Sequence, residues 1–220
     1  MALPVPSRAS VAWRIKPLVW LLALAPAAWL LWGLWRALQG DVSVLGADPA
    51  ETLVHGSGEM ALRTLLATLL LGSLRDLFGL RWLVQLRRLL GLFAFSWASA
   101  HLLAYGGLEL EGDLARLGAD FLERPYILAG GIGLGAMIPL ALTSTNGWRR
   151  RLGRRWSQLH RLVWLAALAA CVHLIWQVRA DLGEALVYVG LFAFVAGQRL
   201  WSTLHPRERS AGARRGPSTA

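Results

Sequence analysis

The chain has 220 residues, of which 55% are hydrophobic and only 16% are charged, well below the roughly one-quarter that is usual in soluble domains. Its formal net charge is +10, and the basic residues cluster between apolar runs. This distribution is typical of a membrane protein that contacts anionic lipid, and it argues against a nucleic-acid partner. A separate flavin- or nucleotide-binding domain of about 100–150 residues does not fit beside the apolar runs.

Six apolar runs follow one another along the chain, and each is close to the roughly 20 residues that a helix needs to cross a bilayer. The runs are continuous rather than alternating, which favours helices over a β-barrel. The sequence therefore predicts an all-α fold, an integral membrane bundle of six transmembrane helices. The predicted spans lie at about 17–36, 57–74, 88–106, 125–143, 158–177 and 183–200.

The predicted bundle forms one domain, residues 17–200, between an N-terminal segment, 1–16, and a basic tail, 201–220. The first apolar run follows Arg14 and Lys16 but lacks a clear cleavage site, so we expect a retained helix rather than a signal peptide. The composition of the tail predicts disorder. No internal repeat is evident.

The basic residues favour one side of the predicted bundle. The N-terminus, the loops after the second and fourth runs and the C-terminal tail hold 18 of the 23 basic residues, and most acidic residues lie on the other side. The positive-inside rule then predicts that both termini are cytoplasmic, as an even number of spans requires.

Three histidines lie within the apolar runs. His101 is about 13 residues into the third span, and His173 follows His160 by 13 residues in the fifth. Both spans are predicted to run outward, so His101 and His173 share a depth near the outer surface. Two neutral imidazoles at one depth are suited to hold haem iron from opposite faces. An interhelical hydrogen bond or a water-lined cavity is the alternative for each histidine.

His160 is a weaker candidate ligand, either for a second haem or as an accessory group. It abuts Arg161 and an arginine-rich loop, so a solvated interfacial histidine competes with that role. A 13-residue step turns an ideal helix by about 1300°, which puts His160 and His173 on different stripes. A second haem also lacks a partner ligand, because Arg88 stands 13 residues before His101. Arg87 and Arg88 are candidates for haem propionate or lipid phosphate contacts, with topology anchors as the alternative.

Other features carry open alternatives. His55 precedes the second run and is expected to be an exposed loop histidine, or else an interfacial group near a quinone or a haem edge. Gly131 and Gly135 fit small-xxx-small helix packing. The loop at 143–156, with its hydroxyl groups and arginines, suits either a phosphate-bearing cofactor or lipid headgroups. Cys171 is expected to be a small buried hydrophobic residue.

Several motifs together resemble one family. These are RRLLGL at 87–92, RPY at 124–126, PLALTST at 139–145 and LGRRWSQLHR at 152–161, with His101 between them. They are similar to the MsrQ (YedZ) family, within the ferric-reductase-like transmembrane group. The likeness extends from about residue 17 to residue 200.

The resemblance implies a multi-pass protein of the bacterial inner membrane that binds one or two haem b groups and FMN. It implies that electrons from quinol reach a periplasmic molybdopterin catalytic subunit, which reduces methionine sulfoxide in oxidised proteins. His101, His160 and His173 match the haem-associated histidines of the family, whereas no FMN contact is assigned. We therefore expect an electron-transport subunit of an oxidoreductase complex, with no catalytic residue of its own.

Two other functions stay open at this stage. One is a transmembrane ferric or oxygen reductase fed by a separate cytoplasmic flavin reductase. The other is a non-redox scaffold or transporter whose histidines line a proton or substrate path. For the partner of an electron carrier, the outer acidic residues suggest a docking face, with simple solvation as the alternative; they are Glu109, Glu111, Asp113, Asp120 and Glu123.

Overall fold

The computed structural model describes residues 11–178 and 182–205, and every regular element in these two ranges is a helix. The long helices are α2 (Lys16–Leu38), α3 (Pro49–Phe78), α4 (Val84–Ala104), α6 (Pro125–Leu142), α9 (Leu162–Gln177) and α10 (Leu182–Leu204). The short ones are η1 (Val11–Ile15), η2 (Arg81–Leu83), η3 (Tyr105–Glu109), α5 (Leu114–Glu123), α7 (Asn146–Leu152) and α8 (Arg154–Leu159).

The six long helices coincide with the six predicted runs, and the all-α class is confirmed for the described ranges. Five helical stretches of this part of the chain are long and apolar enough to cross a membrane: Trp13–Leu38, Val84–Glu109, Pro125–Leu142, Arg154–Gln177 and Leu182–Leu204. Helix α3 is not among them, because charged residues such as Glu59 and Arg63 interrupt its apolar run. The tail predicted to be disordered, 201–220, was placed too early, because α10 continues to Leu204; residues 206–220 lie outside the described residues.

Helix α3 begins eight residues before the predicted span. The side chain of Asp48 accepts a hydrogen bond from the Glu51 backbone N–H at 3.0 Å, and Pro49 occupies the first turn. This is a standard N-cap with proline at the first helical position. At the other end the chain leaves the helix through Gly79, whose φ of +70° lies in the left-handed region that glycine tolerates best.

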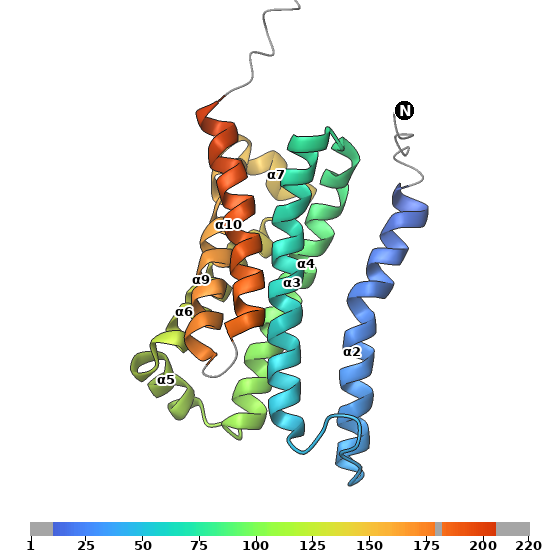
Figure 1. Cartoon of the computed structure of the whole chain (residues 1–220), viewed down its shortest axis with the longest axis vertical. Coiled ribbons are helices and arrows are strands. Elements are labelled where there is room, and N and C mark those ends of the chain that lie inside the picture. The colour runs from blue at the N-terminus through green and yellow to red at the C-terminus, as the bar shows by residue number, and fades with distance from the viewer. Residues whose placement is uncertain (1–10, 179–181, 206–220) are drawn as a thin grey trace, which may run out of the picture.

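The helices form a bundle built on two antiparallel pairs, α3 with α4 and α6 with α9 (Figure 1). Helix α10 packs on α3 and α9, and α2 lies along the outside of the bundle. The start of α2, the end of α3, helix α7 and the end of α10 lie at one end of the bundle, and α5 lies at the other. We call these the α7 end and the α5 end.

Small residues bring the two pairs close together. Ala94 on α4 and Ala166 on α9 are both 0% exposed, and they share one apolar cluster with Leu65 and Met137. A side chain added at Gly133 on α6 would lie 3.4 Å from the Ala166 carbonyl oxygen. The centre of the bundle therefore depends on alanine and glycine at the helix contacts, as in other membrane bundles.

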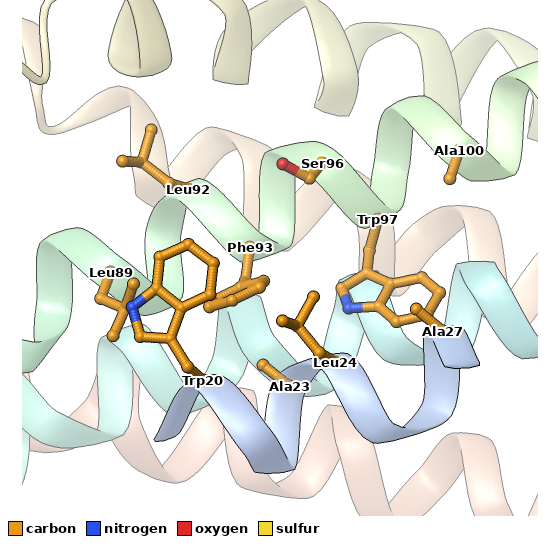
Figure 2. Close-up of a pocket in the computed structure, with 10 residues that line it drawn as sticks. All are labelled: Trp20, Ala23, Leu24, Ala27, Leu89, Leu92, Phe93, Ser96, Trp97 and Ala100. Atoms are coloured by element: carbon orange, nitrogen blue, oxygen red, sulfur yellow. The ribbon is translucent and has the colours of Figure 1, made fainter. Parts of the chain in front are cut away.

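Helix α2 makes a looser contact with α4. Trp20 meets Phe93 edge to face, with ring centres 4.8 Å apart. Figure 2 shows Trp20 and Leu24 of α2 reaching toward Phe93 and Trp97 of α4, around a hollow of about 380 Å³. Its walls are apolar apart from the hydroxyl of Ser96 and the indole nitrogens of Trp20 and Trp97. No residue with a titratable side chain lines this hollow within the described chain.

We expect Ala166→Leu to lower the stability of the bundle by about 1–3 kcal/mol, because the added methylene groups have no space at a fully buried contact. Thermal unfolding of the detergent-purified protein measures the change. Ala193→Leu, on the exposed side of α10, is the matched control and should leave the melting temperature unchanged. Equal melting temperatures for both variants would contradict the packing described for α9.

Candidate functional site

Two imidazole rings meet between α4 and α9. The ring centres of His101 and His173 lie 6.0 Å apart, and the ring planes are inclined by 76°. Both helices run from the α7 end toward the α5 end (Figure 1), and the short distance between the ring centres puts the two residues at the same level along the bundle. The shared depth that the sequence predicts for these two residues is therefore confirmed in the fold.

A backbone carbonyl of the paired helix holds each ring. The Nδ1 atom of His101 lies 2.8 Å from the Val54 carbonyl oxygen on α3, and that of His173 lies 2.6 Å from the Tyr126 carbonyl oxygen on α6. A carbonyl oxygen only accepts, so both Nδ1 atoms carry the proton and donate it. Each neutral ring then keeps its lone pair on Nε2, the form in which histidine binds a metal.

A glycine lies behind each ring. A Cβ atom at Gly58 would stand 2.9 Å from the His101 Nδ1, and one at Gly130 would stand 3.0 Å from the His173 Nδ1. Each glycine follows the accepting carbonyl by four residues, directly above it on the same helix face. Only a residue without a side chain leaves that carbonyl open to the imidazole of the neighbouring helix.

The two arrangements are copies of each other. Val54, Gly58 and His101 recur 72 residues later as Tyr126, Gly130 and His173, and in both copies 47 residues separate the carbonyl from the histidine. The helix pair α3–α4 is thus repeated in space by α6–α9. The repeat is not evident in the sequence, because the recurring positions are few and are separated by unrelated apolar residues.

A cavity of about 780 Å³ opens beside the two imidazoles. Its inner wall is made of small and apolar residues that include Leu65, Ala98, Met137, Ala166 and Ala170. The volume lies in the range of about 300–1,000 Å³ that is usual for cofactor pockets.

His101 and His173 would hold a haem iron between them. Bonds between a metal and a histidine nitrogen are about 2 Å long, and the nitrogen lies about 1 Å from the ring centre, so two imidazoles on one metal have centres about 6 Å apart. The observed separation is 6.0 Å. A wall of small residues suits a flat macrocycle. The iron of the macrocycle is suited by two neutral imidazoles whose Nδ1 atoms are held by backbone carbonyls.

The rim of the cavity at the α5 end is polar. Asp120, only 7% exposed, accepts a hydrogen bond from the Tyr105 hydroxyl and lies 3.0 Å from the Arg124 Nε. The Arg124 guanidinium also donates to the Tyr126 hydroxyl at 3.3 Å. Asp120 therefore holds the rim together and is not available for docking, whereas the other four acidic residues suggested for a docking face are exposed.

His160 lies in a different environment. Its Nδ1 donates to the Trp156 carbonyl oxygen one turn earlier at 3.0 Å, and its ring stacks on Trp156 with centres 3.9 Å apart. The helix is interrupted here, since α8 ends at Leu159 and α9 begins at Leu162. The prediction assumed one continuous helix from His160 to His173, and that assumption was wrong. The two rings nevertheless lie in separate places.

Arg87 and Arg88 are not among the described residues that line the cavity. Arg87 packs against Gly72 on α3, where a Cβ atom would lie 3.5 Å from its guanidinium carbon, and Arg88 is exposed. Both belong to the first turns of α4, and His101 lies near the last turn of that helix. The geometry gives neither arginine a contact with a group held by His101 and His173.

Three further expectations can be compared with the structure. His55 does not lie in a loop: it is part of α3 and lines the cavity, where the Gln177 amide donates to its Nε2 at 2.8 Å. The glycine pair expected in close packing was wrong in part, because Gly135 has nothing within 4 Å of its Cβ position and Gly130 and Gly133 make the contacts with α9 instead. Cys171 is buried, as predicted.

Comparison with known proteins adds to this geometry. The family model described as "Ferric reductase like transmembrane component" matches residues 57–171. The chain is 43% identical over 196 residues to a protein of Xanthomonas euvesicatoria pv. vesicatoria named "Protein-methionine-sulfoxide reductase heme-binding subunit MsrQ", and the match covers 89% of this chain and 90% of that protein. A Caulobacter vibrioides protein of the same name is 40% identical over 195 residues, with 88% and 90% covered. No solved structure matches the chain significantly.

Gly58→Ala should disturb the site without disturbing the bundle. The new methyl group would displace the His101 ring from the Val54 carbonyl, so we expect the haem-to-protein ratio of the purified protein to fall several-fold, and Gly130→Ala to act similarly on His173. Gly135→Ala is the matched control on α6, where the added methyl meets nothing. Pyridine haemochrome absorbance measures the ratio, and unchanged ratios in both variants would refute the role given to these glycines.

Proposed function

The chain belongs to the MsrQ family of haem-binding subunits of protein-methionine-sulfoxide reductase, within the ferric-reductase-like transmembrane family, and we propose that it is a membrane cytochrome of type b that carries electrons to a methionine-sulfoxide reductase catalytic subunit. Haem iron, when bound, supplies the one-electron redox chemistry of this relay. The protein supplies the ligands, their orientation and the apolar wall around them.

The juxtaposition of His101 and His173 is the observation that carries the proposal. The two rings stand at the separation that one iron requires, and both are held in the tautomer that binds metal. Two protein ligands leave no open coordination position on the iron, which favours electron transfer over chemistry on a bound small molecule. A transporter would need histidines that can take up and release protons along a path. The fixed pairing of these two rings does not favour that role.

We propose that the chain binds one haem. The 72-residue repeat that relates His101 to His173 relates Arg88 to His160, so an arginine stands where the partner ligand of His160 is needed. Arginine has no lone pair to offer a metal and stays protonated at all ordinary pH values. His160 stacks on Trp156 instead, near a guanidinium that lies 5.8 Å from the centre of the Trp156 ring.

The orientation in the membrane follows from the charges. Most basic residues lie in segments at the α7 end of the bundle. The start of α2 and the end of α10 also lie at this end (Figure 1). The positive-inside rule supports six spans, including α3, with both termini cytoplasmic in a bacterial inner membrane. His101 and His173 then lie toward the periplasmic surface, beside the partner subunit, a molybdopterin protein that repairs oxidised proteins.

Quinol in the membrane is the proposed source of the electrons. The resemblance also implies FMN, and the arginine-rich segment at α7 and α8 has the charge that a phosphate-bearing cofactor or an anionic lipid needs. The family description favours one second candidate, a ferric reductase supplied by a separate cytoplasmic flavin protein. The relatives that match along nearly the whole chain favour the first candidate.

Replacement of either proposed ligand should remove the haem. We expect His101→Ala and His173→Ala to lose the α-band of reduced b-type haem in absorbance spectra of the purified protein, because one imidazole holds the iron far less tightly than two. His205→Ala, which changes an exposed histidine at the end of α10, should keep the full signal. Full haem retention in both ligand variants would reject the ligand pair.

The number of haems has its own test. Wild-type protein should contain about one haem per chain, and His160→Ala should contain the same amount, because His160 lacks a second ligand across from it. The ratio of haemochrome absorbance to protein mass measures both. A value near two that falls to one in His160→Ala would show that the single-haem proposal is wrong.

A further inference from the structure

A group of four side chains from α3 and α10 lies at the mouth of the cavity. We call it the Tyr188 cluster; it consists of Glu59, Arg63, Glu184 and Tyr188. The Tyr188 hydroxyl lies 3.0 Å from a Glu59 carboxylate oxygen and 3.2 Å from one of Glu184, and it accepts a hydrogen bond from the Arg63 Nε at 2.8 Å. Since a phenol has one proton to donate, the two carboxylates share it.

The cluster is joined to the imidazole site. Glu59 follows Gly58, the residue that packs against His101, and Glu59, Glu184 and Tyr188 line the same cavity as the two imidazoles. The cavity thus has an apolar inner part beside His101 and His173 and a hydrogen-bonding part at the cluster. His55, one turn before Glu59 on α3, forms a second hydrogen-bonded pair with Gln177, and both line the cavity.

The cluster connects the cavity to water. The Glu59 side chain is 34% exposed, and the Glu184 side chain is 66% exposed. A proton taken up by Glu59 has a short path outward: Tyr188 receives it on the hydroxyl oxygen and gives its own proton to Glu184. Arg63 pairs with Glu59 and lies 3.7 Å from Glu184, so the two carboxylates and the guanidinium together carry one net negative charge that a proton neutralises.

The charge of the mouth restricts its ligand. The described charged residues that line the cavity are Asp48, Glu51, Glu59, Glu109 and Glu184, with Arg124 as the one cation, and Arg124 is paired with Asp120. Such a mouth disfavours a phosphate or a carboxylate and favours a neutral ligand that gives up protons. A hydroquinone is neutral, has an apolar ring and loses two protons with its two electrons.

We propose that the mouth of this cavity binds the head group of a hydroquinone at Glu59 and Tyr188, and that Glu59 takes its protons. The inference rests on the proposed function, because the electron acceptor is the haem held by His101 and His173. Hydroquinone becomes quinone by losing two electrons and two protons in two one-electron steps: the haem would take one electron per step and pass it to the reductase subunit before the next step, and the Glu59 carboxylate takes one proton per step. Each proton then leaves through Tyr188 and Glu184 to water before the next arrives.

The other hollow of the bundle is not suited to this chemistry. The groove between α2 and α4 has aromatic walls that would hold an apolar ring (Figure 2), but none of its described lining residues accepts a proton from a hydroquinone. Hydroquinone oxidation needs the proton acceptor and the electron acceptor at the same place. Of these two hollows, the cavity beside His101 has both among its described lining residues.

The test uses the full-length, haem-loaded protein and menadiol as the hydroquinone. Haem reduction is followed by absorbance under anaerobic conditions in Glu59→Gln and Tyr188→Phe. Loss of a proton acceptor costs a reaction about 10²-fold or more, so we expect menadiol to reduce the haem at least about tenfold more slowly in Glu59→Gln. Haem content and reduction by dithionite, which needs no proton acceptor, should stay unchanged.

Two control variants match these changes. Thr203→Val removes a hydroxyl of α10 that lies outside the cavity, and Glu111→Gln removes an exposed carboxylate that does not line it. Both should be reduced by menadiol at the wild-type rate. Wild-type rates in Glu59→Gln and Tyr188→Phe, with haem retained, would overturn the proposal and leave the proposed function intact.

A failure of the proposed function gives a different result: wild-type protein that contains no haem, or haem that menadiol does not reduce.

If Glu59→Gln loses its haem, the fluorescent quinol analogue 2-heptyl-4-hydroxyquinoline N-oxide provides a second measurement on wild-type protein and Tyr188→Phe. Binding that quenches its fluorescence in the wild type and weakens at least about tenfold in Tyr188→Phe supports the site. Equal affinity for the two proteins contradicts it.

Discussion

The hydrogen bond from an imidazole Nδ1 to a backbone carbonyl of the paired helix is the constraint on which the site depends. It occurs twice, from His101 to Val54 and from His173 to Tyr126, and each time a glycine four residues on makes the carbonyl accessible. The bond sets the tautomer, the ring orientation and the distance between helices at once. Two such helix pairs, packed through Ala94 and Ala166, place the free nitrogens of both rings at one cavity.

Much of this arrangement could be predicted from the sequence because it depends on local counts. The length of the apolar runs located all six long helices, and the residue count from the arginine-rich helix starts placed His101 and His173 at one depth. The common depth is observed because α4 and α9 run in the same direction and both histidines lie near the ends of their helices at the α5 end. The early start of α3 also has a local signal, the N-cap residue Asp48 followed by Pro49, which hydropathy alone does not show.

Features that depend on tertiary contacts could not be predicted in this way. In the sequence, Gly58 and Gly130 do not differ from other helix glycines. Their role depends on the imidazoles of His101 and His173, which pack against them from other helices. The burial of Asp120 depends on Tyr105, which reaches it from η3, in addition to the local pair with Arg124 four residues later. Likewise, Glu59 and Tyr188 are 129 residues apart, and no spacing rule connects residues on helices whose pairing is unknown.

The electron paramagnetic resonance spectrum of the oxidised wild-type protein tests the central claim most directly. The claim is that one iron lies between His101 and His173, whose ring planes are inclined by 76°. Imidazole planes that are nearly perpendicular produce a strongly anisotropic low-spin ferric signal, whereas parallel planes produce a rhombic one. We predict a single, strongly anisotropic low-spin signal. A high-spin signal, or a rhombic low-spin signal alone, would contradict the account.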